Sequence, residues 1–181
     1  MERANFPYFL AFVWLLLKAG LKYTSFYSHT YEIGIGLNLL FLPFIVLFAI
    51  RPFFKEKGHS GLFIAKQGMK SGAIYALCVS LGSLLYYKWI DPEFTQNRFD
   101  QHITYVEEQL QEEGRFEELQ KDNPTLRNLT KEDYLEKEIE SAEKFNSPMM
   151  IATFSLLALM ILVLCYSLLM AVLFKLLINR S

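Results

Sequence analysis

Apolar residues are concentrated in four long stretches of the chain, and most charged residues lie between these stretches. A helix needs about 20 apolar residues, with a usual range of about 17 to 25, to cross the hydrocarbon core of a bilayer. Residues 33–50 and 149–174 satisfy this without a single charge, and residues 71–87 do so once the interfacial residues 88–90 are added. The pattern therefore predicts an all-α, polytopic membrane protein.

The first stretch is shorter than the others. Residues 6–17 carry no charge, and the apolar pattern continues past Lys18 to about residue 26. A cleaved signal peptide has similar dimensions. However, Lys18 follows the apolar core directly, and no Ala-x-Ala-like cleavage site is present there. We therefore predict a fourth spanning helix here, which gives a four-transmembrane-helix bundle.

The segment between the third and fourth stretches, residues 91–147, is too long for a plain connection and should hold structure of its own. Asp91-Pro92 ends the third helix, because the residue before a proline disfavours helical backbone, and the same pair can start a new helix. Gly114 and Asn123-Pro124 are typical of turns, and Thr130 with Asp133 resembles a capping box. We predict a hairpin of two amphipathic helices. Their apolar faces comprise Phe99, Ile103, Val106 and Leu110 on the first helix, and Tyr134, Leu135, Ile139, Ala142 and Phe145 on the second.

Charge is distributed as unevenly as hydrophobicity. The formal net charge is −1, yet residues 88–148 hold eight basic and sixteen acidic side chains, and the remainder holds ten basic and three acidic ones. An ordinary globular domain alternates charged and apolar residues around one core, so that class is excluded. No dense basic patch stands on a foldable soluble domain, so we expect no nucleic-acid partner.

The basic residues predict how the chain is oriented. Cytoplasmic loops carry an excess of lysine and arginine. We therefore expect both termini in the cytoplasm and residues 91–147 outside it, in the periplasm of a bacterium. The expected organisation is three membrane helices in residues 1–90, an acidic extracytoplasmic hairpin in 91–147, and the fourth membrane helix with a cytoplasmic C-terminus in 148–181. The residues behind this orientation are Arg3, Arg51, Lys55, Lys57, Lys66, Lys70, Lys175 and Arg180, with Glu56 as the one acidic residue among them and with Lys18 and Lys22 at the opposite end.

Polar side chains at membrane depth are the first candidates for a functional site, because they are costly there. Lys18 and Lys22 are one helical turn apart and project from one face. Glu32, at the same end of the second helix, could form an intramembrane ion pair with them. Two alternatives remain open: each lysine extends its amine to the headgroups, or the group serves a substrate or ion. Asn38 in the second helix is predicted to form a hydrogen bond across the bundle.

The third helix carries small residues at every fourth position. Such a face allows close helix packing in lipid, either inside the bundle or against a partner subunit. The sequence does not distinguish these two uses. The helix-packing face consists of Gly68, Gly72, Ala76 and Ser80.

The sequence carries no motif typical of catalysis or of metal binding. The sequence contains no phosphate-binding loop, no nucleophile-elbow motif and no EF-hand pattern. The histidines are scattered, and Cys78 and Cys165 are interpreted as buried small hydrophobic residues rather than as a disulfide or metal ligands. We therefore expect no enzyme activity, no catalytic residues, no metal and no cofactor.

Two motifs resemble a known family. These are G-L-F-I-A-K-Q-G-M-K-S-G at residues 61–72 and W-I-D-P-E-F at residues 89–94, with an apolar helix between them. In these motifs, and in its length, the chain resembles a Bacteroidota-type bacterial family of unknown function. The resemblance implies a small inner-membrane protein with four spans and brings no activity, substrate or catalytic residue.

Together these features favour a non-catalytic multi-pass inner-membrane protein that acts as an accessory or scaffold subunit. Its expected partners are the lipid bilayer and a membrane protein or a second copy of the chain. The acidic hairpin and the small-residue face would be its interaction surfaces. The alternative hypothesis is a small transporter or channel component with a path near Lys18, Asn38 and Glu32.

Overall fold

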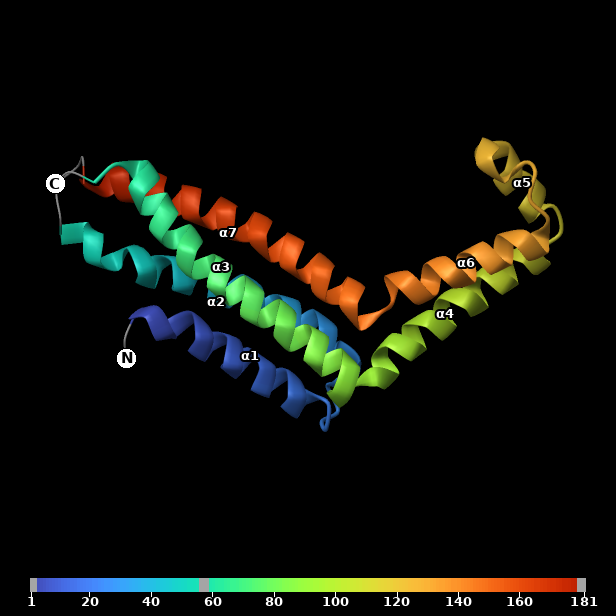
Figure 1. Cartoon of the computed structure of the whole chain (residues 1–181), viewed down its shortest axis with the longest axis horizontal. Helices are drawn as coiled ribbons and strands as arrows, with labels where there is room; N and C mark the ends of the chain where they lie inside the picture. Colours follow the sequence, from blue (N-terminus) through green and yellow to red (C-terminus); the bar gives the residue numbers. More distant parts are fainter. Residues whose placement is uncertain (1–2, 56–58, 179–181) are drawn as a thin grey trace. The chain divides into compact units, whose positions relative to one another are not determined.

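The computed structural model describes residues 3–55 and 59–178 (Figure 1). Glu56, Lys57 and Arg180, on which the predicted orientation partly relies, lie outside the described residues. The described part of the chain is helical and contains no β-strand, which confirms the all-α class. It divides into two compact units. We call Met1–Tyr86 with Ala152–Ser181 the apolar unit, and Tyr87–Ile151 the acidic unit.

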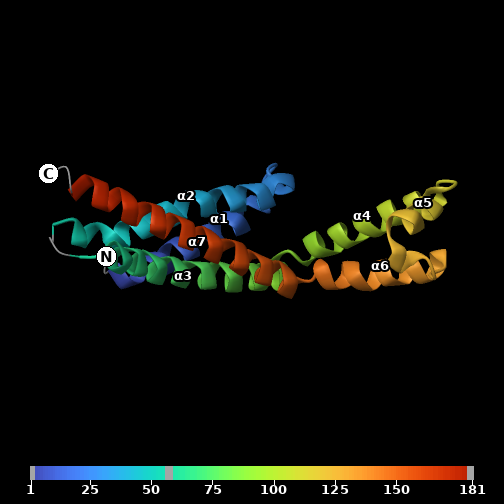
Figure 2. The same cartoon turned by 90° about the horizontal axis from the view of Figure 1, so that it is seen from above.

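The apolar unit contains α1 (Phe6–Leu21), α2 (Thr30–Ile50), α3 (Gly61–Leu85) and most of α7 (Pro148–Ile178). In this unit α2, α3 and α7 run alongside one another (Figure 2). Three segments are long and apolar enough to cross a membrane, namely Tyr27–Phe53, Gly61–Ile90 and Pro148–Leu176.

The first helix is shorter than a normal span. With 16 residues, α1 is about 24 Å long at the usual rise of about 1.5 Å per residue. The hydrocarbon core is about 30 Å thick. The structure therefore supports three of the four predicted spans by length and composition, and the four-span bundle is not confirmed.

The third helix begins ten residues before the uncharged stretch that predicted it. Ser60 has extended backbone, and its hydroxyl accepts a hydrogen bond from the Phe63 N–H at 3.2 Å, which fixes the helix start. Lys66 and Lys70, which precede that stretch, lie within the first three turns of α3. The helix then continues into a π-helical turn at Tyr86–Ile90. Hydrophobicity alone missed this boundary because a capped helix can extend well beyond the apolar core of the bilayer.

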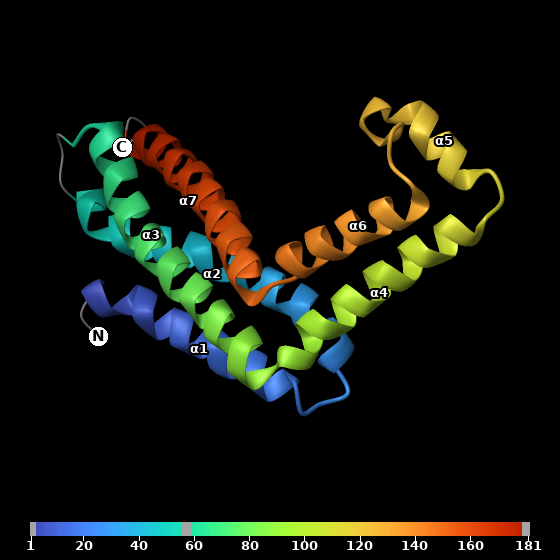
Figure 3. The ribbon, with the colours of Figure 1, turned by 45° about the vertical axis from the view of Figure 1, so that its right-hand side comes forward.

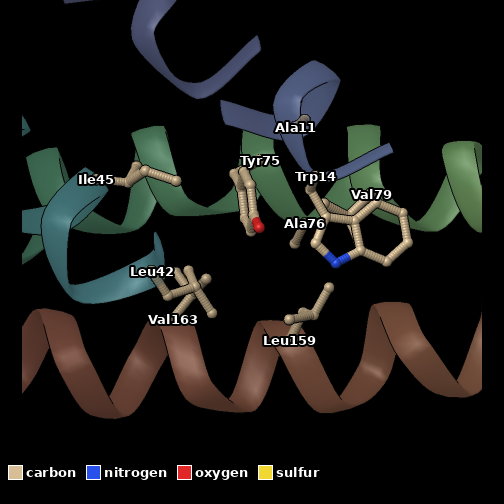
Figure 4. Close-up of a cluster of buried hydrophobic side chains, with 9 residues drawn as sticks. All are labelled: Ala11, Trp14, Leu42, Ile45, Tyr75, Ala76, Val79, Leu159 and Val163. Atoms are coloured by element: carbon tan, nitrogen blue, oxygen red, sulfur yellow. The ribbon is translucent and has the colours of Figure 1, made fainter. Parts of the chain in front are cut away.

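The core of the apolar unit is built from side chains of α1, α2, α3 and α7 (Figure 4). Trp14 from α1, Tyr75 from α3 and Val163 from α7 are each at most 2% exposed. A second cluster, which includes Ile50, Ile64 and Phe174, closes the end of the unit where α3 begins. Large apolar side chains on the outer faces are left exposed, as expected for surfaces that face lipid. They include Phe12, Leu40, Phe44, Leu81, Leu157 and Leu173.

The acidic unit contains α4 (Pro92–Gln111), α5 (Arg115–Asp122) and α6 (Lys131–Phe145). Helices α4 and α6 lie side by side, as the predicted hairpin requires (Figure 3), and α5 contacts α4 after the turn at Gly114. The predicted capping box is present, since Thr130 Oγ1 accepts from the Asp133 N–H at 3.1 Å and Asp133 accepts from the Thr130 N–H at 3.2 Å.

The acidic unit differs from the predicted hairpin in two details. It contains a third helix, α5, which the prediction of two helices did not include and which begins directly after Gly114, whose φ of +82° is readily adopted only by glycine. On α6, Ile139 and Phe145 were assigned to the packed face, yet they are 37% and 55% exposed. The buried apolar side chains of this unit are few, namely Tyr87, Val106, Phe116 and Ala142 among the described residues.

Candidate functional site

Lys18 occupies the interior of the apolar unit. It belongs to α1, one turn after Trp14, and it is only 3% exposed. Its ammonium nitrogen lies 5.0 Å from the centre of the Trp14 ring and 4.9 Å from that of Tyr86, which begins the π-helical turn. Both distances are typical of cation–π contacts. The amine is therefore held between two aromatic rings and does not extend freely along the surface.

The ring of Trp14 is itself fixed by α2. Its indole N–H donates a hydrogen bond to the carbonyl oxygen of Gly34 at 3.0 Å. A Cβ atom on Gly34 would lie 3.8 Å from the Lys18 nitrogen, so α2 approaches the amine closely at this point. Glu32, the predicted ionic partner, lies in the first turn of α2 with an exposed side chain, and Lys22 is half-buried. The ion pair stays a prediction.

Asn38 joins α2 to α3. The Tyr75 hydroxyl donates a hydrogen bond to Asn38 Oδ1 at 2.7 Å, and the Tyr75 side chain is completely buried. The predicted hydrogen bond of Asn38 across the helices is thus confirmed. Because this contact satisfies two polar groups at the centre of the unit, it stabilises the packing of α2 against α3.

The small-residue face of α3 is packed inside the apolar unit over at least two of its four positions. A Cβ atom on Gly68 would lie 2.9 Å from Val46 Cγ1 of α2, and one on Gly72 would lie 2.7 Å from Val163 Cγ1 of α7. Ala76 belongs to the main core cluster. Ser80 is buried, and neither its hydroxyl nor that of Ser167 on α7 has a hydrogen-bond partner among the described residues.

Two cavities flank the first half of α3. One, of about 320 Å³, lies among α1, α2 and α3, with Gln67, Lys70 and Ser71 on its α3 wall. The other, of about 440 Å³, lies between α3 and α7, and Gln67 and Lys70 line it as well. The charged and amide side chains of this segment therefore stand at the edge of largely apolar hollows. Neither hollow could be predicted from the sequence, because both depend on how neighbouring helices pack.

The acidic unit is held by polar contacts more than by apolar burial. His102 on α4 lies 3.3 Å from Glu138 on α6, and the Lys131 amine donates to the carbonyl oxygen of Leu110 at 3.3 Å. The hydrogen bonds from Thr130 hold the pKa of Asp133 below its ordinary value. Burial raises the pKa of Tyr134, whose ring packs near Phe116.

The turn into the acidic unit follows the predicted position but not the predicted cap. Pro92 occupies the first turn of α4, and Asp91 is the residue before it. The Asp91 carboxylate forms no hydrogen bond with the N–H groups of the first turn of α4, although the Asp91 side chain is only 1% exposed. The burial of Asp91 was not foreseen, because an aspartate before a proline usually marks an exposed helix start.

Potential metal ligands do not gather anywhere in the described part of the chain, where no group of three or more histidine, cysteine, aspartate or glutamate side chains is placed to hold an ion. Both cysteines are free thiols. Cys78 is half-buried, but Cys165 is exposed, so the prediction that both are buried is wrong for Cys165. Position 165 lies on a face of α7 that the other helices do not cover.

These features define a helical protein with three segments suited to crossing a membrane and a separate acidic unit. The chain belongs to the family described as "Protein of unknown function (DUF4199)", whose profile matches residues 6–176. No curated protein and no solved structure matches the chain. The matched residues span both units.

Proposed function

We propose that this protein is a non-catalytic, multi-pass membrane protein that acts as an accessory or scaffold subunit of a membrane complex. The observation that carries the proposal is the acidic unit, a compact helical body with few buried apolar side chains. A body with so small a core has most of its side chains available for contact with another molecule.

The surface of the acidic unit favours a basic partner. Glu132, Glu136, Glu140 and Glu143 are all exposed on α6. Their spacing of four, four and three residues places them along one face of the helix. Carboxylates arranged in this way speed the encounter with a positively charged surface and orient it.

In this proposal the chain crosses the inner membrane of a bacterium four times. Both termini would be cytoplasmic and residues 91–147 periplasmic. The end of α2, the start of α3 and the end of α7 lie together. An excess of lysine and arginine there, including Arg51, Lys66 and Lys175, supports this orientation. This arrangement requires α1 to cross the membrane despite its length.

The test is purification of the tagged full chain in a mild detergent. We expect a partner protein in a fixed ratio to the chain. Replacing the four glutamates of the α6 face by glutamine should remove that partner, because it deletes the charge while keeping a similar helix propensity. The matched control replaces Glu93, Glu107 and Glu108 of α4 and Glu112 at its C-cap, which removes the same charge from the other helix of the pair.

Two results would contradict the proposal. One is a monodisperse chain that copurifies with nothing under conditions that preserve its helicity. The other is solute flux through the reconstituted protein that is lost in Lys18→Met, which would favour the transporter alternative instead.

A further inference from the structure

The cavity between α3 and α7 has an apolar floor and a basic rim. Met69 and Ala73 of α3 and Met160 and Val163 of α7 form the floor, and the volume is about 440 Å³. Lys66 and Lys70, both exposed, stand at its edge together with Gln67. The cavity therefore places an apolar surface beside two positive charges and an amide.

Helix geometry gives the depth of the two lysines relative to the hydrocarbon core of the bilayer. The candidate span Gly61–Ile90 has 30 residues and is about 45 Å long, about 15 Å more than the hydrocarbon core. When that excess is shared between the two ends, Lys66 lies close to the boundary of the hydrocarbon. Lys70 lies one turn deeper.

The direction of the two side chains carries both amines toward the membrane surface. In an α-helix the Cα–Cβ bonds tilt toward the N-terminus. The N-terminus of α3 is the end nearer to the membrane surface for both lysines. Each amine therefore extends toward the headgroup layer, while the floor of the cavity continues into the hydrocarbon.

Lys66 and Lys70 are also correctly spaced for a single anion. Residues four apart on a helix have their Cβ atoms about 5 to 6 Å apart, so the two ammonium groups repel each other unless an anion lies between them. A phosphodiester fits between two such amines, and the Gln67 amide can donate to it.

We propose that this cavity binds one anionic phospholipid, with its phosphate between Lys66 and Lys70 and an acyl chain against Met69, Ala73 and Met160. Charge complementarity selects this occupant over a second copy of the chain, because the ends of α2 and α7 on this side of the unit carry the basic residues Arg51 and Lys175. Basic pockets between membrane helices commonly bind anionic headgroups.

The experiment is native mass spectrometry of the full chain in detergent, titrated with phosphatidylglycerol or with phosphatidylcholine of the same acyl composition. Wild type should bind phosphatidylglycerol preferentially. A basic side chain near an anionic headgroup strengthens binding by about fivefold. The double variant K66Q/K70Q should therefore bind phosphatidylglycerol about 25-fold more weakly and retain no preference between the two lipids.

The matched control is R51Q/K175Q, which removes the same charge from the same end of the unit without touching the cavity. It should keep its preference for phosphatidylglycerol. A second variant, Ala73→Phe, fills the apolar floor and should weaken the binding of both lipids. Circular dichroism establishes that each variant keeps its helicity.

The proposal is overturned if wild type binds the two lipids equally, or if both double variants lose phosphatidylglycerol to the same extent. In the second case the lysines would act only as general surface charge. A lipid-free dimer that Ala73→Phe dissociates would also overturn it, because the cavity would then be occupied by a second copy of the chain.

Discussion

Lys18 is buried in the apolar unit, and the groups around it explain how a charge is tolerated there. Each cation–π contact contributes about 0.5 to 2 kcal/mol, with the larger values at sites away from water. Two rings face this amine, and one of them is fixed by the hydrogen bond from Trp14 to Gly34. The result is a connection among α1, α2 and the end of α3 that depends on one side chain.

Gly72 provides the clearest test at the scale of single residues. A Cβ atom there would lie 2.7 Å from Val163 Cγ1 and 2.8 Å from Cγ2. Valine in a helix has little freedom to rotate, so in Gly72→Ala the helices must separate. Overpacking of this kind costs about 1 to 3 kcal/mol. We expect a lower midpoint of thermal unfolding in detergent, measured by circular dichroism.

The control for this prediction is Gly36→Ala on α2, where an added Cβ would have no neighbour within 4 Å. It should not destabilise the protein. Adding Val163→Ala to Gly72→Ala should restore the lost stability, because it removes the two methyl groups that clash. If Gly72→Ala unfolds at the wild-type temperature, α3 and α7 are not in close contact at this position.

The sequence predicted the type of residue at such positions better than the contacts they make. The spacing of Gly68, Gly72 and Ala76 indicated a close helix approach, but it could not say whether a partner or another part of the chain fills it. Val163 lies far from Gly72 in sequence, so no local pattern connects them. The aromatic surroundings of Lys18 were missed for the same reason, since Tyr86 comes from another helix.

At the scale of helices, capping signals were more informative than amphipathic faces. Thr130 with Asp133 marked the start of α6 correctly, because the motif is formed by residues three apart. The buried face of α6 was assigned less accurately. Glu138 pairs with His102 of α4, while Ile139 next to it is exposed. A helix pair with so few buried side chains is oriented by polar contacts that hydrophobic periodicity does not reveal.

The capping box predicts a pH dependence of the first turn of α6. In the folded protein the pKa of Asp133 is below its ordinary value of 3.8, because the charged form accepts hydrogen bonds from Thr130. Its stabilising effect is therefore complete above that value and is lost as the pH falls through the lower, folded pKa. Asp133→Asn should weaken protection of this turn from hydrogen exchange at neutral pH. The difference from wild type should shrink below pH 3.8.

The variant and the wild type are compared at equal pH, because the acidic unit carries many carboxylates besides Asp133. Glu132→Gln is the matched control, since it removes one charge from the neighbouring position without touching the capping box. It should leave protection of the turn nearly unchanged at every pH. A constant difference between Asp133→Asn and wild type down to the lowest pH would show that the charge of Asp133 is not what stabilises the helix start.

At the scale of the whole molecule, the crossing of α1 decides the topology. A helix of about 24 Å can cross a core of about 30 Å only if the bilayer thins or if flanking residues extend the apolar length. The basic residues at the two ends of α1 do not indicate one orientation, because Arg3 precedes the helix and Lys18 and Lys22 lie near its other end. If α1 does not cross, the N-terminus lies on the same side of the membrane as Ser25.

Cysteine labelling from one side of the membrane distinguishes these topologies. In a background with Cys78→Ala and Cys165→Ala, single cysteines replace Ala4, Ser25, Ser60 or Ser141, and an impermeant maleimide is added to intact cells. We expect Ser25→Cys and Ser141→Cys to react, because both positions are exposed and are predicted to lie outside the cytoplasm. The variants at Ala4 and Ser60 should react only after the cells are permeabilised.

Other labelling patterns would show which helix does not cross the membrane. If Ala4→Cys reacts in intact cells together with Ser25→Cys, α1 does not cross and the protein has three spans. If Ser60→Cys and Ser141→Cys react from the same side, α3 does not cross, which would contradict the length and composition of Gly61–Ile90. The choice between four spans and three therefore depends on the variant at Ala4.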